Sequence, residues 1–144
     1  MITTSTYREA PTQTVDVDGT RFAYRRLGPE HGAPVVFLNH LGANLDNWDP
    51  RVVDGIAARR PVITFDNRGV GASQGRTPRS VEAMARDVIA FVRALGLEQV
   101  DLFGFSLGGS SPRSSRRGNR RWSGGWCSPG PARRAVWAST GSRP

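Results

Sequence analysis

A serine with a glycine two residues away on each side, in the segment Gly104 to Gly108 (GFSLG), is the clearest candidate for chemistry in this chain. The segment directly follows Val100 to Phe103, whose β-branched and aromatic residues predict a buried strand. A serine on a tight turn from strand to helix holds its hydroxyl exposed, and the glycines leave room for neighbouring elements. We therefore predict Ser106 as a nucleophile, with Gly104 and Gly108 permitting the turn.

The strands that must position this serine are predicted from apolar patterns. Thr12 to Tyr24 alternates between apolar and polar residues around Asp18-Gly19, which predicts two strands joined by a tight turn. Three later runs, 35–38, 61–65 and 100–103, are short and mainly apolar. Runs of this kind are typical of strands that are buried on both faces of a parallel sheet.

Two helices are predicted between these three runs, each with a capping residue at its start. Asp49 can cap a helix that has Pro50 at its first position, and Ser80 can cap a longer helix that ends before Gly96. This alternation of strands and helices predicts an α/β class, doubly wound fold with a mostly parallel sheet. The positions expected to face the core are Val52, Val53 and Ile56 in the first helix and Val81, Met84, Ala85, Val88, Ile89, Val92 and Leu95 in the second.

Two further motifs follow the first and second of these strands. Residues 66–73 (DNRGVGAS) resemble the Asp-x-Arg-Gly-x-Gly-x-Ser turn of the α/β-hydrolase superfamily, and residues 39–44 (NHLGAN) stand where that family has its oxyanion loop. With the serine motif, they resemble the family in order and spacing over residues 12–109. The resemblance implies the first part of an α/β-hydrolase domain. It also implies hydrolysis of a small-molecule ester, lactone or related acyl substrate without a metal or other cofactor. We interpret Asp66 and Arg68 as a structural pair that shapes its loop rather than as catalytic groups.

The oxyanion loop departs from the family's commonest His-Gly-x-Gly pattern. Asn39 and His40 occupy the places of His and Gly, so the backbone N–H groups of Leu41 and Leu107 are expected to form the oxyanion hole. Each such donor is worth roughly a hundredfold to a thousandfold in rate. An Asn-x-Leu-Gly loop resembles the enol-lactone hydrolase branch of the family. Trp48, which follows the loop, is expected to lie in the core.

The groups that activate the serine are missing from this sequence. The family's triad runs in the order serine, acid, histidine, yet no His, Asp or Glu follows Ser106. His40 lies in the oxyanion loop, and His31 is expected in a solvated turn. We therefore predict that a chain with this sequence forms an incomplete hydrolase domain and is inactive.

The composition of the chain changes after Gly109. Residues 1–109 carry 12 arginines and 12 acidic residues, whereas residues 110–144 carry eight arginines and no acid, so the net charge of +8 comes from this tail. The tail also has no Leu, Ile, Phe or Met, which predicts a disordered basic segment. We likewise expect residues 1–11 to form a flexible N-terminus.

Two interpretations of the tail remain open. The sequence has no lysine, which fits a GC-rich gene, and a reading frame shifted after Gly109 would supply the Arg, Gly, Pro, Ser and Trp found there. Read back with a one-base shift, Arg121 to Pro131 can encode a sequence like the family's next strand. Alternatively, the arginines and Trp122, Trp126 and Trp137 bind nucleic acid or another anionic surface. We favour the frameshift, and we therefore do not expect a nucleic-acid partner.

The remaining signals concern location. Cys127 is the single cysteine, so no disulfide can form within the chain. No segment approaches the roughly 18 apolar residues of a membrane span, and the N-terminus lacks the apolar stretch of a signal peptide. We expect a cytoplasmic protein with no membrane partner.

Overall fold

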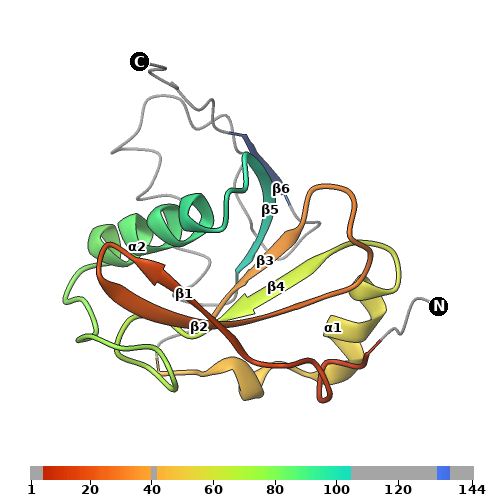
Figure 1. The fold of residues 1–144 in the computed structure, drawn as a ribbon, viewed down its shortest axis with the longest axis horizontal. Coiled ribbons are helices and arrows are strands. Elements are labelled where there is room, and N and C mark those ends of the chain that lie inside the picture. The colour runs from red at the N-terminus through yellow and green to blue at the C-terminus, as the bar shows by residue number, and fades with distance from the viewer. Residues whose placement is uncertain (1–4, 40–41, 105–132, 137–144) are drawn as a thin grey trace.

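The computed structural model describes residues 5–39 and 42–104, and the backbone of residues 133–136. Its centre is a six-stranded sheet with the strand order β1-β2-β4-β3-β5-β6 (Figure 1). The strands are β1 (Gln13–Val17), β2 (Thr20–Leu27), β3 (Val35–Leu38), β4 (Val62–Phe65), β5 (Gln99–Gly104) and β6 (Arg133–Val136). The helices are the 3-10 turn η1 (Leu45–Asn47), α1 (Pro50–Ala57) and α2 (Val81–Ala94).

The middle of the sheet is parallel and its outer strands are antiparallel. Strand β3 pairs in parallel with both β4 and β5, while β2 pairs antiparallel with β4 and β1 antiparallel with β2. Successive residues of β3 face opposite sides, so Val36 and Leu38 pack in the cluster that contains α2, and Val35 and Phe37 in the cluster that contains α1. Helices on both faces of a partly parallel sheet confirm the predicted α/β class.

The predicted hairpin is confirmed by its turn. Asp18 and Gly19 have φ angles of 51° and 78°, the left-handed values that a two-residue turn between twisted strands requires. The Asp16 carboxylate accepts a hydrogen bond of 3.0 Å from the Gly19 N–H. The sequence Asp-Gly therefore sets the register in which Val17 pairs with Thr20.

Both predicted helix caps are present. The Asp49 carboxylate accepts a hydrogen bond from the Arg51 N–H at 2.9 Å, and the Ser80 hydroxyl accepts one from the Ala83 N–H at 3.1 Å. Gly96, with a φ of 70°, follows the end of α2. Within the part of the chain that the structure describes, no helix is long and apolar enough to cross a membrane.

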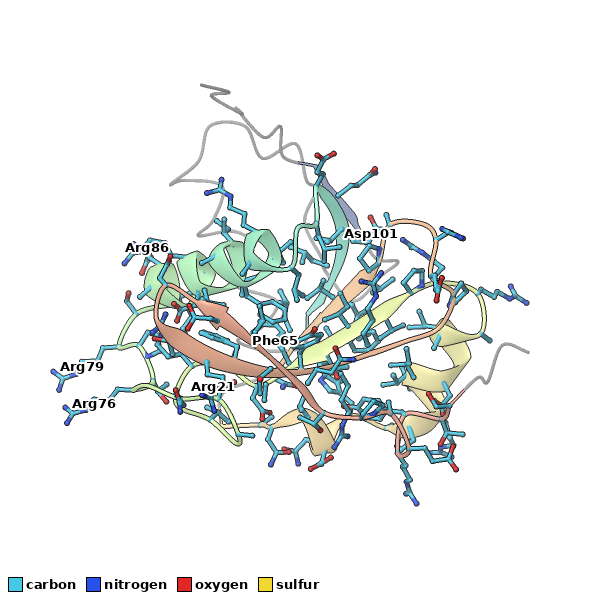
Figure 2. All side chains as sticks on the ribbon, in the orientation of Figure 1. Arg21, Phe65, Arg76, Arg79, Arg86 and Asp101 are labelled. Atoms are coloured by element: carbon cyan, nitrogen blue, oxygen red, sulfur yellow. The ribbon has the colours of Figure 1, made fainter. Side chains whose placement is uncertain are left out.

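One expectation about the helix faces is wrong, and one core residue was missed. Val52 was expected to be buried but is 44% exposed, because Val53 and Ala57, one turn apart, form the buried face of α1. Phe91, which was not among the expected core residues, is fully buried and stacks on Phe65 with ring centroids 4.4 Å apart. Phe65 lies near the middle of the sheet (Figure 2), so this aromatic pair joins α2 to β4.

The N-terminal segment is packed rather than flexible from residue 5 onward. Tyr7 is 2% exposed and Ala10 5% exposed, and both belong to the core cluster on the α1 side. The Tyr7 N–H donates to the Asp54 carboxylate at 2.7 Å, and the Tyr7 hydroxyl donates to the Leu45 carbonyl. One large aromatic side chain with two polar partners thus fixes a segment whose average composition is polar. Residues 1–4 lie outside the described residues.

Strand β6 is the second departure from the expected domain organisation. Residues 133–136 pair antiparallel with β5 at the edge of the sheet, within the segment for which we expected no regular structure (Figure 1). The expectation of disorder is therefore wrong for these four residues. The rest of residues 110–144 lies outside the described residues, and its disorder stays a prediction.

Candidate active site

The candidate site lies where the parallel strands β3, β4 and β5 end. Gly104 is the last residue of β5 and is the register partner of Leu38, the last residue of β3. Because these two residues are partners, the chain leaves β3 and β5 at neighbouring positions. The loops that follow carboxyl ends of parallel strands are where α/β proteins bind ligands. The structure thus brings the start of the oxyanion loop and the end of the strand before the serine motif to one place.

The atoms predicted to do the chemistry lie outside the described residues, namely the Ser106 hydroxyl and the N–H groups of Leu41 and Leu107. Gly108 of the serine motif and His40 also lie outside the described residues. Their roles stay predictions. The described neighbours show how the two loops are held.

Asn39 fixes the beginning of the loop that is predicted to supply the oxyanion hole. Its side chain is 3% exposed, and its Nδ2 donates a hydrogen bond of 3.1 Å to the carbonyl of Phe65, the last residue of β4. This bond ties the end of β3 to the end of β4. A buried amide with such a partner has a structural task, which sequence reasoning did not assign to it.

Asp66 holds the far end of the same loop. Its carboxylate is 2% exposed and accepts hydrogen bonds from the Leu45 N–H at 2.7 Å and the Ala72 N–H at 2.9 Å. Gly71, with a φ of 55°, lies so close that a Cβ there would come within 2.4 Å of this carboxylate. The carbonyl of Asp66 also accepts a bond of 2.7 Å from the Ser73 hydroxyl. These contacts explain the Asp, second Gly and Ser of the motif as parts of one folded loop.

Arg68 holds this loop against α2 and β2 and does not pair with Asp66. Its guanidinium forms a bidentate ion pair with Asp87 on α2, at 2.9 to 3.0 Å, and also donates to the Thr20 hydroxyl at 2.7 Å. The hydrogen bonds that Arg68 donates to the Asp87 carboxylate raise the pKa of Arg68 above its ordinary value. Both side chains shape the loop, but through separate partners, so the expected pair is wrong. The sequence could not predict Asp87 as the partner of Arg68, because Asp87 lies on α2 and no local pattern connects the two residues.

Two arginines between this loop and α2 contrast with Arg68. Arg76 and Arg79 are exposed, and their side chains point away from the sheet (Figure 2). Neither forms an ion pair with another described residue. Only Arg68 is therefore part of the framework that holds the loop against α2.

Trp48, which was expected in the core, is partly buried and packs against the core cluster on the α1 side. Its ring meets Phe37 edge to face at 4.8 Å and lies 6.0 Å from the ring of Phe103 on β5. Its Nε1 is buried and has no hydrogen-bond partner among the residues that the structure describes. Trp48 also borders a hollow of about 210 Å³ that is lined by Tyr7, Arg8, Arg25, Asp46 and Pro50 as well. Burial at this place raises the pKa of Tyr7 above its ordinary value.

Two further expectations concern histidine and metal. His31 is exposed in its turn, as expected. Among residues 5–39 and 42–104, no group of three or more His, Cys, Asp or Glu side chains is placed to hold a metal ion.

Replacing Asp66 with alanine is expected to lower the free energy of unfolding by about 2 to 4 kcal/mol, because it leaves the Leu45 and Ala72 N–H groups without their acceptor. Urea denaturation of the full chain measures this. The matched control is Glu98→Ala, which removes an exposed carboxylate and is expected to change the free energy by less than about 0.5 kcal/mol. Equal effects of the two substitutions would contradict the role given to Asp66.

Comparison with known proteins adds the following. Residues 33–110 match the family model described as alpha/beta hydrolase fold. Over 93 residues the chain is 37% identical to the non-heme chloroperoxidase of Streptomyces lividans. The matched region covers 64% of this chain and 34% of that protein. Over 82 residues it is 33% identical to 3-oxoadipate enol-lactonase 1 of Acinetobacter baylyi, covering 57% of this chain and 30% of that protein. The chain thus spans about a third of the length of these relatives.

Solved structures give the same picture. An alpha/beta hydrolase fold protein from Chitinophaga pinensis superposes with a TM-score of 0.71 and 47% identity, over 73% of this chain and 38% of that one. The enol-lactonase from Burkholderia xenovorans superposes with a TM-score of 0.62 and 30% identity, over 69% of this chain and 39% of that one.

Proposed function

Because the chain belongs to the α/β-hydrolase family, we propose that it descends from a serine hydrolase that acts on a small ester, lactone or related acyl compound. In this proposal the Ser106 hydroxyl attacks the acyl carbon, the alcohol leaves, and the acyl group remains on the serine until water removes it. The negative charge that develops on the carbonyl oxygen is bound by the backbone N–H groups of Leu41 and Leu107.

The register of β3 and β5 carries this proposal. Leu38 and Gly104 are partners, so the oxyanion loop and the serine motif begin side by side. The loop from Asn39 to Leu45 is tied to the end of β4 at both ends, by the Asn39 amide and the Asp66 carboxylate. A loop held in this way supports a preorganised donor at Leu41, because backbone donors act best when they need not rearrange.

The substrate class rests on relatives as well as on the loop. An enol-lactonase is among both the sequence relatives and the structural neighbours, and the Asn-x-Leu-Gly loop resembles that branch. This supports a lactone as one member of the proposed class. The chloroperoxidase relative shows that the same fold is also associated with other named activities.

The chain as written is proposed to be inactive. No His, Asp or Glu follows Ser106, and without a general base the serine keeps the low nucleophilicity of an alcohol. The family match ends at residue 110, where the basic composition begins, which supports a reading frame shifted after Gly109. Sequencing the gene across this point tests the shift. An intact frame with no hydrolase-like sequence in any frame downstream would overturn it.

The full chain is expected to hydrolyse an activated ester such as p-nitrophenyl acetate about 10⁶-fold more slowly than an enzyme with a complete triad, which is the loss seen in the well-studied protease case. Ser106→Ala is expected to give the same trace as the parent chain. Absorbance of released p-nitrophenol measures both. Steady turnover that disappears in Ser106→Ala would show that the chain supplies its own base, and the proposed inactivity would then be wrong.

A further inference from the structure

The hollow beside Trp48 is lined by residues that have no part in the predicted chemistry. It has a volume of about 210 Å³, and its lining consists of Tyr7, Arg8, Arg25, Asp46, Trp48 and Pro50. These residues come from the N-terminal segment, from β2 and from the stretch between η1 and the start of α1. One buried water needs roughly 10 to 15 Å³ of such space, so the hollow has room for a molecule of several non-hydrogen atoms.

Arg25 is a largely buried cation at this hollow. Side chains alternate along β2, so Arg25 lies on the same face as Leu27, in the cluster on the α1 side, whereas Arg26 is exposed on the opposite face. The Arg25 side chain is only 16% exposed. Its guanidinium lies over the ring of Tyr7, 5.4 Å from the centroid, and its Nε donates to the Thr12 hydroxyl at 3.1 Å. These two contacts fix the orientation of the guanidinium.

The lining carries more positive than negative charge. Its one carboxylate, Asp46, is 71% exposed and forms an ion pair with Arg25 at 2.9 Å. Arg8 is exposed and forms no ion pair with another described residue. The nearby Asp49 is already paired with Arg51 at 2.7 Å. Because an ion pair with so exposed a partner adds little stability, an added anion can share Arg25 with Asp46, or replace Asp46, at little cost.

The donors and the walls together indicate the class of ligand. A guanidinium presents a planar fork of N–H groups that matches the two oxygens of a carboxylate, and this interaction is stronger where little water competes. The indole of Trp48 and the ring of Pro50 add apolar surface to the same hollow. A ligand that uses both parts combines a carboxylate with a small flat apolar group. An inorganic oxyanion would leave the apolar surface unused.

We propose that this hollow is a binding site for a small carboxylate with a flat apolar body, such as an aromatic acid. The carboxylate binds to the guanidinium groups of Arg25 and Arg8, and the apolar body lies against Trp48 and Pro50. Asp46 is then an internal competitor for Arg25. The site does not depend on Ser106, because no residue of its lining belongs to the predicted triad or oxyanion hole.

Titration of the full-length chain with benzoate tests this site. The eight arginines of residues 110–144 also attract anions, so the readout has to be local. Replacing Trp122, Trp126 and Trp137 with Phe leaves Trp48 as the one tryptophan, whose ¹⁵N-labelled indole N–H gives a single NMR signal. This signal is expected to shift with benzoate until one site per chain is saturated. Benzamide, which has the same shape without the charge, and inorganic phosphate are each expected to bind at least about tenfold more weakly.

Substitutions in the lining have opposite expected effects on benzoate affinity. Asp46→Asn removes the competitor and is expected to raise the affinity several-fold, whereas Arg8→Gln is expected to lower it several-fold. Arg25→Lys keeps the charge but loses the planar fork, and is expected to lower it about tenfold. The matched control is Arg26→Gln, which removes an exposed arginine from the other face of β2 and is expected to leave the affinity unchanged.

Three results would overturn the proposal. If the Trp48 signal does not saturate in the parent chain or in Asp46→Asn, the hollow does not bind benzoate. Because Asp46 and Arg8 are exposed, this outcome does not depend on whether Arg25→Lys folds. Equal affinity for benzamide or for inorganic phosphate would rule out a carboxylate with an apolar body as the ligand. Equal losses in Arg8→Gln and Arg26→Gln would show an effect of overall charge rather than a site.

Discussion

A chimeric protein in which residues 1–109 are joined to the C-terminal part of the Chitinophaga pinensis relative is expected to hydrolyse activated esters, and Ser106→Ala is expected to lower its kcat by about 10⁶-fold. That relative is 47% identical to this chain over the superposed residues, which make up 38% of its own length, so most of its chain is available to complete the fold. The prediction requires that this added part contribute an acid and a histidine, because the histidine is then the base that takes the proton of Ser106. Ser106 is the one triad side chain that this chain would contribute, so the activity of the chimera is expected to depend on it.

The control for this prediction is Ser80, another serine within residues 1–109. Ser80 caps α2 through its hydroxyl and lies on a different loop, so Ser80→Ala is expected to cost about 1 kcal/mol of stability and to leave kcat unchanged. Circular dichroism establishes that both variants fold. Hydrolysis that survives Ser106→Ala in the folded chimera would assign the nucleophile to another residue.

Replacing Phe91 with alanine is expected to lower the free energy of unfolding by about 3 to 5 kcal/mol, the usual range for a fully buried aromatic residue. The Phe91 ring contacts three aromatic rings, stacking on Phe65 at 4.4 Å and lying 6.1 Å from Phe22 and 5.9 Å from Tyr24. Its loss leaves a cavity between α2 and the sheet. It also removes ring interactions worth about 0.5 to 1.5 kcal/mol each beyond the buried area.

Urea denaturation of the full chain measures this effect. The matched control is Val52→Ala on α1, because Val52 is an apolar helix residue that is 44% exposed and is expected to change the free energy by less than about 0.5 kcal/mol. If Phe91→Ala behaved like this control, α2 would not be packed on the sheet as described. The family fold would then not form in this chain.

Local signals account for the parts of the fold that the sequence predicts well. The Asp18-Gly19 turn, the caps at Asp49 and Ser80 and the stop at Gly96 each depend on the conformation or hydrogen bonding of one or two neighbouring residues. Such features are decided within a few residues of chain. Phe91 also fits the periodicity of α2, since it lies three residues after Val88, so the sequence does carry the signal for its burial.

Contacts between distant segments account for what the sequence does not predict. Arg68 pairs with Asp87 rather than with Asp66, and Tyr7 bonds with Asp54 and Leu45, although nothing in the local pattern connects these residues. At the candidate site, the sequence predicted the motif residues but not the task of the Asn39 side chain. The pairing of β6 with β5 is likewise decided by an edge that is formed elsewhere in the chain.

The most direct test of the central claim, that Ser106 is the nucleophile of a hydrolase by descent, is mass spectrometry of the folded chimera after reaction with an alkyl fluorophosphonate. The activated serine hydroxyl displaces fluoride and forms a stable P–O bond, so the adduct marks the nucleophile. We predict one equivalent of adduct on the peptide that contains Ser106, and none in Ser106→Ala. An adduct on a different residue, or ester hydrolysis by a chimera that leaves Ser106 unmodified, would contradict the assignment.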